Sequence, residues 1–342
     1  MSPHISISPV GRATAGPVAP AAQVLITGLG EVGAMFYDPI NDRVWTSDSG
    51  GWFKYVDAAT RLGGAVAHNI FLSQYRQFLF DAPRSRVLSP YPLTGAPQEL
   101  GPGVSSYDLA TLPADWANVA LPTPVGGITS SVIAMSASHV FTAATVGADN
   151  IVTKRDIDTF AEVDSTVVWS VNYTNPYIAI VGSRVLAVNN ALPAYTILNA
   201  DTMAVERSGT PPAGNVARYA PGVIGNYAYY GNNTPGVTRI DVTTGDVIKV
   251  AIPTAGGAPC ACVVAGSTVV FPYRDSGNND IRLRVLDASL ATVSDTLIAL
   301  ASEFLLGGSN GPIYHCCLDG ADYLWLRFSQ SMLFTGVKCA NR

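Results

Sequence analysis

The chain has 342 residues, of which 13% are charged, and its formal net charge is −5 at pH 7. Ordinary soluble domains carry roughly 25% charged residues, so this surface must consist mainly of uncharged polar residues and glycine. The lack of Lys/Arg clusters argues against nucleic acid and anionic lipid as partners, because both are held by basic patches. No apolar run is long enough to span a bilayer, and the first ten residues lack the regions of a Sec signal. We therefore expect neither membrane insertion nor Sec export.

A short motif recurs along the chain at intervals of about 40 to 50 residues. In each copy, an Asp or Asn at the end of a strand-like segment is followed three residues later by Thr or Leu. The six copies are Asp57 with Thr60, Asp108 with Thr111, Asp156 with Thr159, Asn199 with Thr202, Asp241 with Thr244 and Asp287 with Leu290. This period is typical of a propeller, and repetition lets one core extend over a length that would otherwise suggest two domains.

Each repeat is predicted to contain four strands, and the second strand carries two consecutive apolar residues. The seven pairs are Val44-Trp45, Val87-Leu88, Val140-Phe141, Val185-Leu186, Ala228-Tyr229, Val269-Val270 and Leu324-Trp325. A strand of a sheet with one solvent-exposed face would alternate apolar and polar residues. Consecutive apolar residues therefore predict a strand covered on both faces. Blades stacked around an axis provide that cover.

The third strands are predicted to end at the Asp or Asn of the motif. They cover 52–56, 104–107, 151–155, 195–198, 237–240 and 281–286. The last repeat offers only three strands, at 313–318, 323–328 and 332–338, so a closing strand within 23–29 is expected to complete it. We predict an all-β, seven-bladed β-propeller of four-stranded blades over residues 23–342, closed by its N-terminal strand.

The turn between the third and fourth strands, as in 55–62 and 239–248, resembles that of the broad family of YVTN-like and quinoprotein-like propellers. The resemblance covers essentially the whole chain and implies the fold. The family includes enzymes, lectins, scaffolds and virion proteins, so the resemblance implies no particular activity.

Polar residues gather in the predicted connections between second and third strands, which lie on one face of a propeller around its channel. A proline-rich insertion at 90–103 adds a possible rigid contact loop. Short polar side chains on this face could bind a sugar or the backbone of a partner, or they could simply satisfy tight turns. The candidate interaction face consists of Asp48, Trp52, Tyr91, Asn189, Asn190, Asn232, Asn233, Asp275, Asn278, Asn279 and Asp280.

No catalytic, cofactor or metal site is predicted. The histidines lack the spacing of metal ligands, and the tryptophans occupy unequal places in their repeats, so a lectin signal is weak. The five cysteines are expected to be buried apolar residues rather than a disulfide framework or a metal site; they are Cys260, Cys262, Cys316, Cys317 and Cys339. Nucleophile elbows, P-loops and dinucleotide fingerprints are absent from the sequence.

Residues 1–22 contain four Pro, five Ala and almost no charge, without a strand or helix period. They predict an extended arm, which is either a tether lying across a neighbouring subunit or a disordered tail. We expect a non-enzymatic structural or interaction module of a large assembly, namely a bacteriophage virion, made in the host cytoplasm and attached to other subunits through this arm. The alternatives are a carbohydrate- or receptor-binding propeller and a metal-dependent propeller hydrolase or lyase.

Overall fold

The structure is a computed structural model, and its description covers most of the strands and the short turns between them. The described residues are 5–7, 24–27, 32–48, 52–67, 79–91, 103–108, 116–119, 128–146, 148–170, 177–189, 194–211, 221–232, 236–252, 262–275, 280–299, 313, 315–328 and 331–339. These residues form β-strands and one short 3-10 helix, η1 (Ala82–Arg84).

The described strands make seven antiparallel sheets, each built mainly from strands that follow one another in the chain. The first two sheets hold β3 (Val32–Asp38), β4 (Arg43–Asp48), β5 (Trp52–Asp57) and β6 (Gly63–Ala67), then β7 (Leu79–Asp81), β8 (Arg86–Tyr91), β9 (Gly103–Asp108) and β10 (Trp116–Val119). The next two hold β11 (Ile128–Met135), β12 (His139–Val146), β13 (Asp149–Asp156) and β14 (Glu162–Ser170), then β15 (Tyr177–Val181), β16 (Arg184–Val188), β17 (Tyr195–Asn199) and β18 (Val205–Gly209).

The remaining sheets follow the same plan. Two hold β19 (Gly222–Ile224), β20 (Tyr227–Gly231), β21 (Gly236–Asp241) and β22 (Val247–Ala251), then β23 (Val263–Ala265), β24 (Thr268–Arg274), β25 (Ile281–Leu286) and β26 (Thr292–Ala299). The last joins β27 (His315–Leu318), β28 (Tyr323–Arg327) and β29 (Ser331–Lys338) to β2 (Val24–Thr27) and β1 (Ile5–Ile7).

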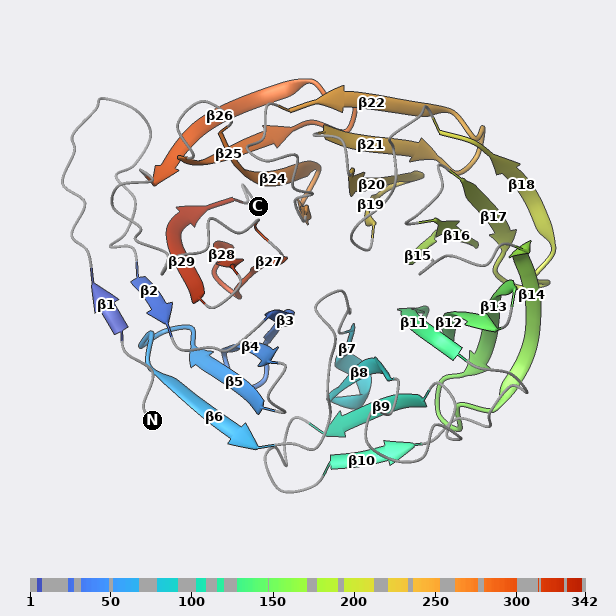
Figure 1. The fold of residues 1–342 in the computed structure, drawn as a ribbon, viewed down its shortest axis with the longest axis horizontal. Helices are drawn as coiled ribbons and strands as arrows, with labels where there is room; N and C mark the ends of the chain where they lie inside the picture. The colour runs from blue at the N-terminus through green and yellow to red at the C-terminus, as the bar shows by residue number, and fades with distance from the viewer. Residues whose placement is uncertain are drawn as a thin grey trace.

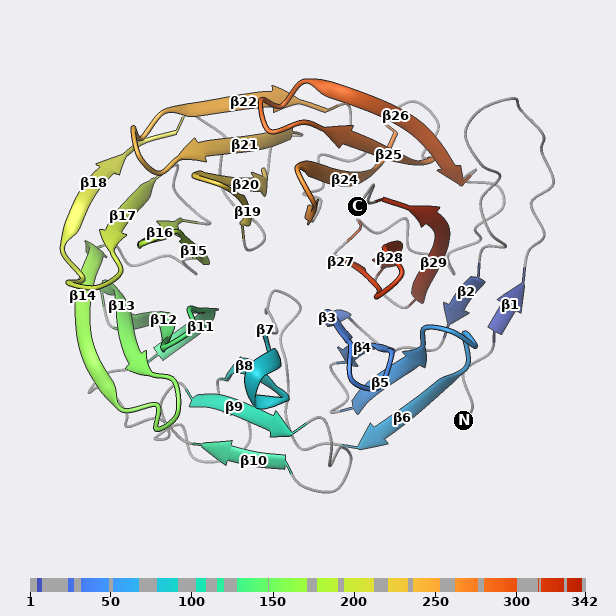
Figure 2. The ribbon, with the colours of Figure 1, turned by 180° about the vertical axis from the view of Figure 1, so that it is seen from behind.

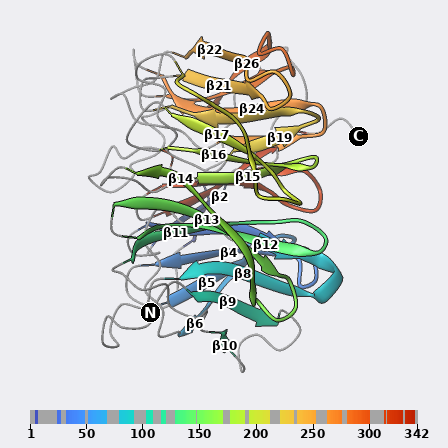
Figure 3. The ribbon, with the colours of Figure 1, turned by 90° about the vertical axis from the view of Figure 1, so that its right-hand side faces the viewer.

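The sheets stand side by side in a ring, in the order of the chain (Figure 1). The first strand of each sheet lies nearest the centre and the fourth lies at the perimeter, as the view from behind also shows (Figure 2). Contacts join first strands of neighbouring sheets, among them β11 with β15, β15 with β19, β19 with β23, β23 with β27 and β27 with β3. The outermost strand β14 faces the reader when the ring is seen from the side (Figure 3).

The last sheet takes two strands from the N-terminal end of the chain. β2 pairs with β29, with Val24 opposite Phe334 and Thr27 opposite Ser331. β1 then pairs with the other edge of β2, as the fifth and outermost strand of this sheet. The sequence pattern of the predicted extended arm, residues 1–22, did not indicate the strand at residues 5–7. A three-residue segment is too short for a periodic signal, and the strand exists because a free edge lies within its reach.

The apolar pairs of the second strands fall in β4, β8, β12, β16, β20, β24 and β28, as predicted. Their described side chains are at most 1% exposed, which confirms that these strands are covered on both faces. The covering residues come from neighbouring sheets; Leu186, for example, shares one apolar cluster with residues of the sheets on either side. Burying a Val, Leu or aromatic side chain stabilises the fold by about 1.5–3 kcal/mol, so the repeated pairs supply much of the core.

The recurring Asp or Asn orders the turn that follows the third strand. In the β11–β14 sheet, Oδ1 of Asp156 accepts hydrogen bonds from the backbone N–H groups of Asp158 and Thr159 and from the Thr159 hydroxyl. Equivalent bonds are made by Asp57, Asn199, Asp241 and Asp287. We call this arrangement the Asx turn. The motif that defines the repeat is thus a backbone-ordering device.

Each described Asx turn places one residue in the left-handed conformation, and that residue donates its N–H to the carbonyl of the Asp or Asn. These residues are Arg61, Phe160, Met203, Gly245 and Leu290. Gly245 has φ +82°, and a Cβ there would lie 2.9 Å from the hydroxyl of Tyr195 in the preceding sheet, so the position requires glycine. The Asx turn therefore meets the preceding sheet at close range.

Side chains of the preceding sheet donate hydrogen bonds to carbonyl oxygens of the Asx turn at four consecutive junctions. The bonds are Arg86 to Ile157, Lys154 to Asp201 with Thr166 to Met203, Tyr195 to Gly245, and Tyr229 with Arg239 to Ala288. At the junction of the β27–β29 sheet with the β3–β6 sheet, the guanidinium of Arg61 lies 3.9 Å from the ring centroid of Phe334. One turn thus joins each of these sheets to its neighbour.

The Asx turn makes stability depend on pH. Hydrogen bonds from the backbone N–H and hydroxyl of Thr159 lower the pKa of Asp156. Because the folded pKa is depressed, this stabilisation is present above the ordinary carboxyl pKa of about 3.9 and is lost as the pH falls through the folded value. We expect Asp156→Asn, which keeps the Oδ1 acceptor as Asn199 does, to match the wild type at pH 7 and to lose less stability on acidification.

Urea unfolding of both proteins at neutral and acidic pH would test this expectation. Asp156→Ala, which removes the acceptor, should be less stable than both at pH 7. An Asp156→Asn variant as acid-sensitive as the wild type would contradict the assignment.

Candidate functional site

The described residues of the predicted interaction face flank connections between second and third strands. Asp48 ends β4, Trp52 begins β5 and Tyr91 ends β8. Asn190, Asn233, Asn278 and Asn279 lie outside the described residues. The structure describes the side chains of four members of the face, which are Asn189, Asn232, Asp275 and Asp280.

Three consecutive sheets close this connection with the same backbone hydrogen bond. The N–H groups of Asn189, Asn232 and Asp275 donate to the carbonyls of Ala194, Gly236 and Asp280 at 2.9, 3.0 and 2.9 Å. Asn189 and Asn232 are each only 1% exposed. Oδ1 of Asn232 accepts a hydrogen bond from the Thr238 hydroxyl at 2.9 Å. These two asparagines close turns inside the sheet, and their burial favours the structural alternative over sugar contact.

We expect Asn232→Ala to destabilise the protein by about 1–2 kcal/mol, because the buried Thr238 hydroxyl loses its acceptor. Urea unfolding would measure the change. Asn226→Ala, at an exposed position of the same sheet, is the matched control and should stay close to the wild type. An Asn232→Ala protein of unchanged stability that has lost binding to a glycan array would show that the side chain contacts a ligand.

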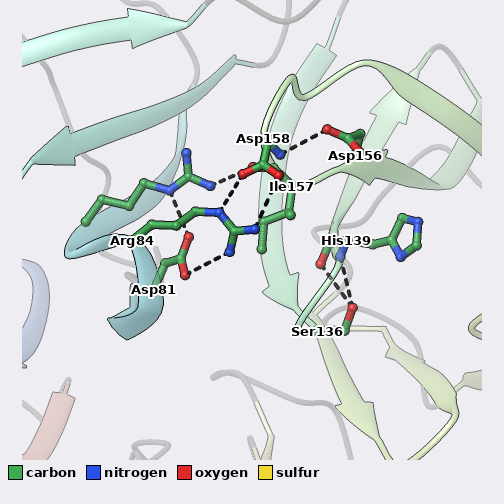
Figure 4. Close-up of polar contacts among 8 residues, drawn as sticks. Asp81, Arg84, Ser136, His139, Asp156, Ile157 and Asp158 are labelled. Atoms are coloured by element: carbon green, nitrogen blue, oxygen red, sulfur yellow. Dashed lines mark hydrogen bonds and ion pairs between the residues drawn. The ribbon is translucent and has the colours of Figure 1, made fainter.

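A charged cluster that sequence analysis missed lies between the β7–β10 and β11–β14 sheets (Figure 4). The carboxylate of Asp81, 1% exposed, accepts from Nε of Arg86 at 2.8 Å and lies 3.4 Å from NH1 of Arg84. Arg84 reaches across to the exposed carboxylate of Asp158, and Arg86 donates to the carbonyl of Ile157. The cluster binds two sheets together. Asp158 and Ile157 are distant in sequence from Arg84 and Arg86, so no local pattern indicates the contacts between the two sheets.

We expect Asp81→Ala to lower the free energy of unfolding by about 3 kcal/mol, because it leaves the largely buried Arg86 guanidinium without its carboxylate. Arg84→Ala should change stability far less, since the Arg84–Asp158 pair is exposed and solvent screens it. Chemical denaturation of the two variants gives the comparison. Equal losses in both variants would contradict the proposed difference in burial.

Among the described residues, the nearby serine and histidine make no hydrogen bond with a third group that would orient the imidazole. The Ser138 hydroxyl lies 2.8 Å from Nδ1 of the adjacent His139, while the Ser136 hydroxyl bonds the backbone of His139. Asp156 lies opposite His139 in the sheet, and its carboxylate accepts hydrogen bonds within its own Asx turn. Nucleophilic catalysis needs a base oriented by a third group, and these residues instead order a surface hairpin.

A second charged cluster lies on one face of the β23–β26 sheet. Asp295 on β26 accepts from Nε of Arg282 and Nε of Arg284, each at 2.9 Å, and from the Tyr273 hydroxyl at 2.8 Å. Burial acts to raise the pKa of Asp295, but hydrogen bonds from Arg284, Tyr273 and Arg282 outweigh it and hold the pKa below its usual range. A carboxylate so occupied is a poor proton acceptor, so the cluster is a structural ion-pair network.

The four described cysteines, Cys262, Cys316, Cys317 and Cys339, are not disulfide-bonded. Burial raises the pKa of Cys262 to about 11 and that of Cys339 to about 12, and it also raises the pKa of Cys317. Because the thiolate is the reactive form, the raised pKa values of Cys262, Cys317 and Cys339 disfavour reactivity at neutral pH. Cys260 lies outside the described residues. Within the described ranges, no group of three or more His, Cys, Asp or Glu is placed to hold a metal ion.

Apolar side chains are exposed on the outermost strands of four consecutive sheets, which form a continuous arc of the perimeter in Figure 1. Six of the eight large hydrophobic residues exposed in the described part of the chain lie on these strands. We call them the outer belt: Val163 and Val167 on β14, Val205 on β18, Ile248 on β22, and Val293 and Leu297 on β26, with exposures between 41% and 62%. Sequence analysis missed the belt, because neither β14 nor β26 shows a regular alternation of apolar and polar residues.

No protein-family model and no curated protein sequence matches the chain. A solved structure that is similar is the crystal structure of BamB from Moraxella catarrhalis, a β-propeller, with a TM-score of 0.55 and 11% sequence identity. The alignment covers 96% of this chain and 99% of that chain. The chain has the β-propeller fold. The predicted fold class is confirmed at this level, and an identity this low shows the fold alone. No helix in the described segments has the length and apolar character needed to cross a membrane.

Proposed function

We propose that the seven sheets are the blades of a seven-bladed β-propeller closed by β2, and that this propeller is a non-enzymatic interaction module of a large assembly. The ring order of the sheets and the ladder between β2 and β29 support the count and the closure. Closing the last blade with an N-terminal strand ties the two ends of the ring together, which suits a rigid module.

The observation that carries the functional proposal is the outer belt. Scattered single hydrophobic residues are normal on a surface, but six of eight gathered on successive edge strands are typical of a contact surface. The outer edges of these sheets also present unpaired backbone groups, because no further strand lies beyond β14, β18, β22 or β26 among the described strands. Both features suit protein–protein contact rather than chemistry on a small substrate.

The clusters of charged side chains point the same way. Asp81, Arg84 and Arg86 join neighbouring sheets, and Asp295 is occupied by two arginines and a tyrosine. We propose a bacteriophage particle as the assembly, with the N-terminal arm as the attachment, because a low-charge propeller with an extended arm suits a virion protein. The burial of Asn189 and Asn232 removes two of the side chains on which the carbohydrate-binding alternative depends.

We expect Val163→Glu/Val293→Glu to keep the fold, because both positions are exposed, and to lose association with the particle. The control is Ser165→Glu/Thr292→Glu, which adds the same charge at exposed polar positions of β14 and β26. Recovery of each protein with particles on a density gradient is the measurement, with circular dichroism as the check on folding. Equal recovery of the belt variant and its control would overturn the role of the belt.

A further inference from the structure

The strand β1 is joined to its neighbour in an unusual way. Ile7 lies opposite Val24, so residues 8–23 form the whole connection between two adjacent antiparallel strands. Antiparallel neighbours are usually joined by loops of about two to five residues, whose geometry sets the register. This connector contains three prolines, two glycines and one charged residue, Arg12, and it is too long to set a register. The β1 strand is therefore held by its own ladder.

The acceptor edge is the outer side of β2. The segment Val24–Ile26 pairs with β29 on its inner side and with β1 on its outer side. The inner ladder does not involve β1, so β2 presents the same acceptor edge whichever strand occupies it. A second copy of the chain presents an identical edge.

We propose that β1 is an exchangeable strand, and that in the assembled state Ile5–Ile7 of one copy pairs with Val24–Ile26 of a second copy. This inference rests on the proposed function as an interaction module, and it names the partner of the arm. The same three residue pairs form within one chain and between two chains, so exchange sacrifices no pairing in the sheet. Only the path of the connector differs.

The concentration of the protein decides whether β1 pairs with β2 of its own chain or with β2 of a second copy. A covalent connection of sixteen residues holds β1 near its own β2 at an effective concentration on the order of millimolar, so pairing within the chain dominates in dilute solution. Copies packed in a particle reach comparable local concentrations. Sixteen connector residues, 8–23, extend to about 50 Å at roughly 3.3 Å per residue, which is enough to reach a neighbouring copy. Reciprocal exchange between two copies closes as a two-fold dimer.

Thiol cross-linking in the purified protein tests the proposal directly. Ser6 lies opposite Leu25, so Ser6→Cys on one chain and Leu25→Cys on another can form a disulfide only if β1 has crossed to the second copy. The two variants are mixed at about millimolar concentration, where exchange competes. After mild oxidation, non-reducing gels and peptide mass mapping detect the bond between positions 6 and 25. We expect a cross-linked dimer in the mixture and no such bond in either variant alone.

The double variant Ser6→Cys/Leu25→Cys in dilute solution is the control for geometry, and it should cross-link within one chain. If it does so while the mixture gives no dimer, the proposal is overturned. If the double variant forms no bond at all, β1 does not pair with β2, and the proposal also fails.

Two connector variants supply a second measurement. Replacing residues 8–23 with Asn-Gly makes a two-residue type I′ hairpin that fixes β1 on its own β2, so light scattering should give a monomer. Deleting residues 8–23 joins Ile7 directly to Val24, leaves no turn and permits pairing only between chains, so it should give a dimer. A monomer in both cases would overturn the proposal. These readouts need no particle, so they can fail or succeed independently of particle association by the outer belt.

Discussion

The ring depends on the Asx turn at the end of each third strand. A single side-chain oxygen, such as Oδ1 of Asp156, accepts several hydrogen bonds and fixes the turn in one conformation. That conformation presents carbonyl oxygens to the preceding sheet and places one residue in the left-handed region. A sheet in a ring is covered only by its neighbours, so each junction needs a contact that sets the distance and angle between sheets. The Asx turn provides this contact wherever it is described.

Different side chains occupy the left-handed position of the Asx turn at different junctions of the ring. Phe160, Met203 and Leu290 occupy the left-handed position with buried apolar side chains, although non-glycine residues are uncommon there. Gly245 leaves room for the Tyr195 hydroxyl. Arg61 stacks on Phe334, and this cation–π contact accompanies a buried Nε that has no hydrogen-bond partner among the described residues. A left-handed backbone conformation is therefore common to the described Asx turns. The side chain at the left-handed position differs with the neighbouring sheet that it contacts.

This constancy explains what the sequence could predict. The Asp or Asn and the apolar pair recur because each performs a local task, so their period revealed the repeat and the second and third strands. The segment 23–29 was singled out differently, because the last repeat lacked a fourth strand, and β2 within it pairs with β29. The contacts between sheets could not be predicted from the sequence. Arg86 contacts Ile157, and Arg61 contacts Phe334, across large separations in the chain. The burial of Asn189 and Asn232 was missed for a related reason. A turn-forming asparagine looks the same in sequence whether its side chain faces solvent or the sheet.

In the proposed interaction module, the outermost strands would mediate contact with a partner while the junctions between sheets stabilise the fold. Exposed apolar residues on an open edge strand invite uncontrolled pairing, and proteins counter this hazard with neighbouring charges. Here Val163 lies between Glu162 and Asp164, Val205 precedes Glu206, and Ile248 precedes Lys249. These charges disfavour indiscriminate stacking of edges, while the apolar residues remain available to a partner whose surface accommodates both. Buried Lys154 and Arg327 bond across junctions of the ring. In the proposed module, specificity in binding belongs to this perimeter and to the strand that the N-terminal segment adds to it.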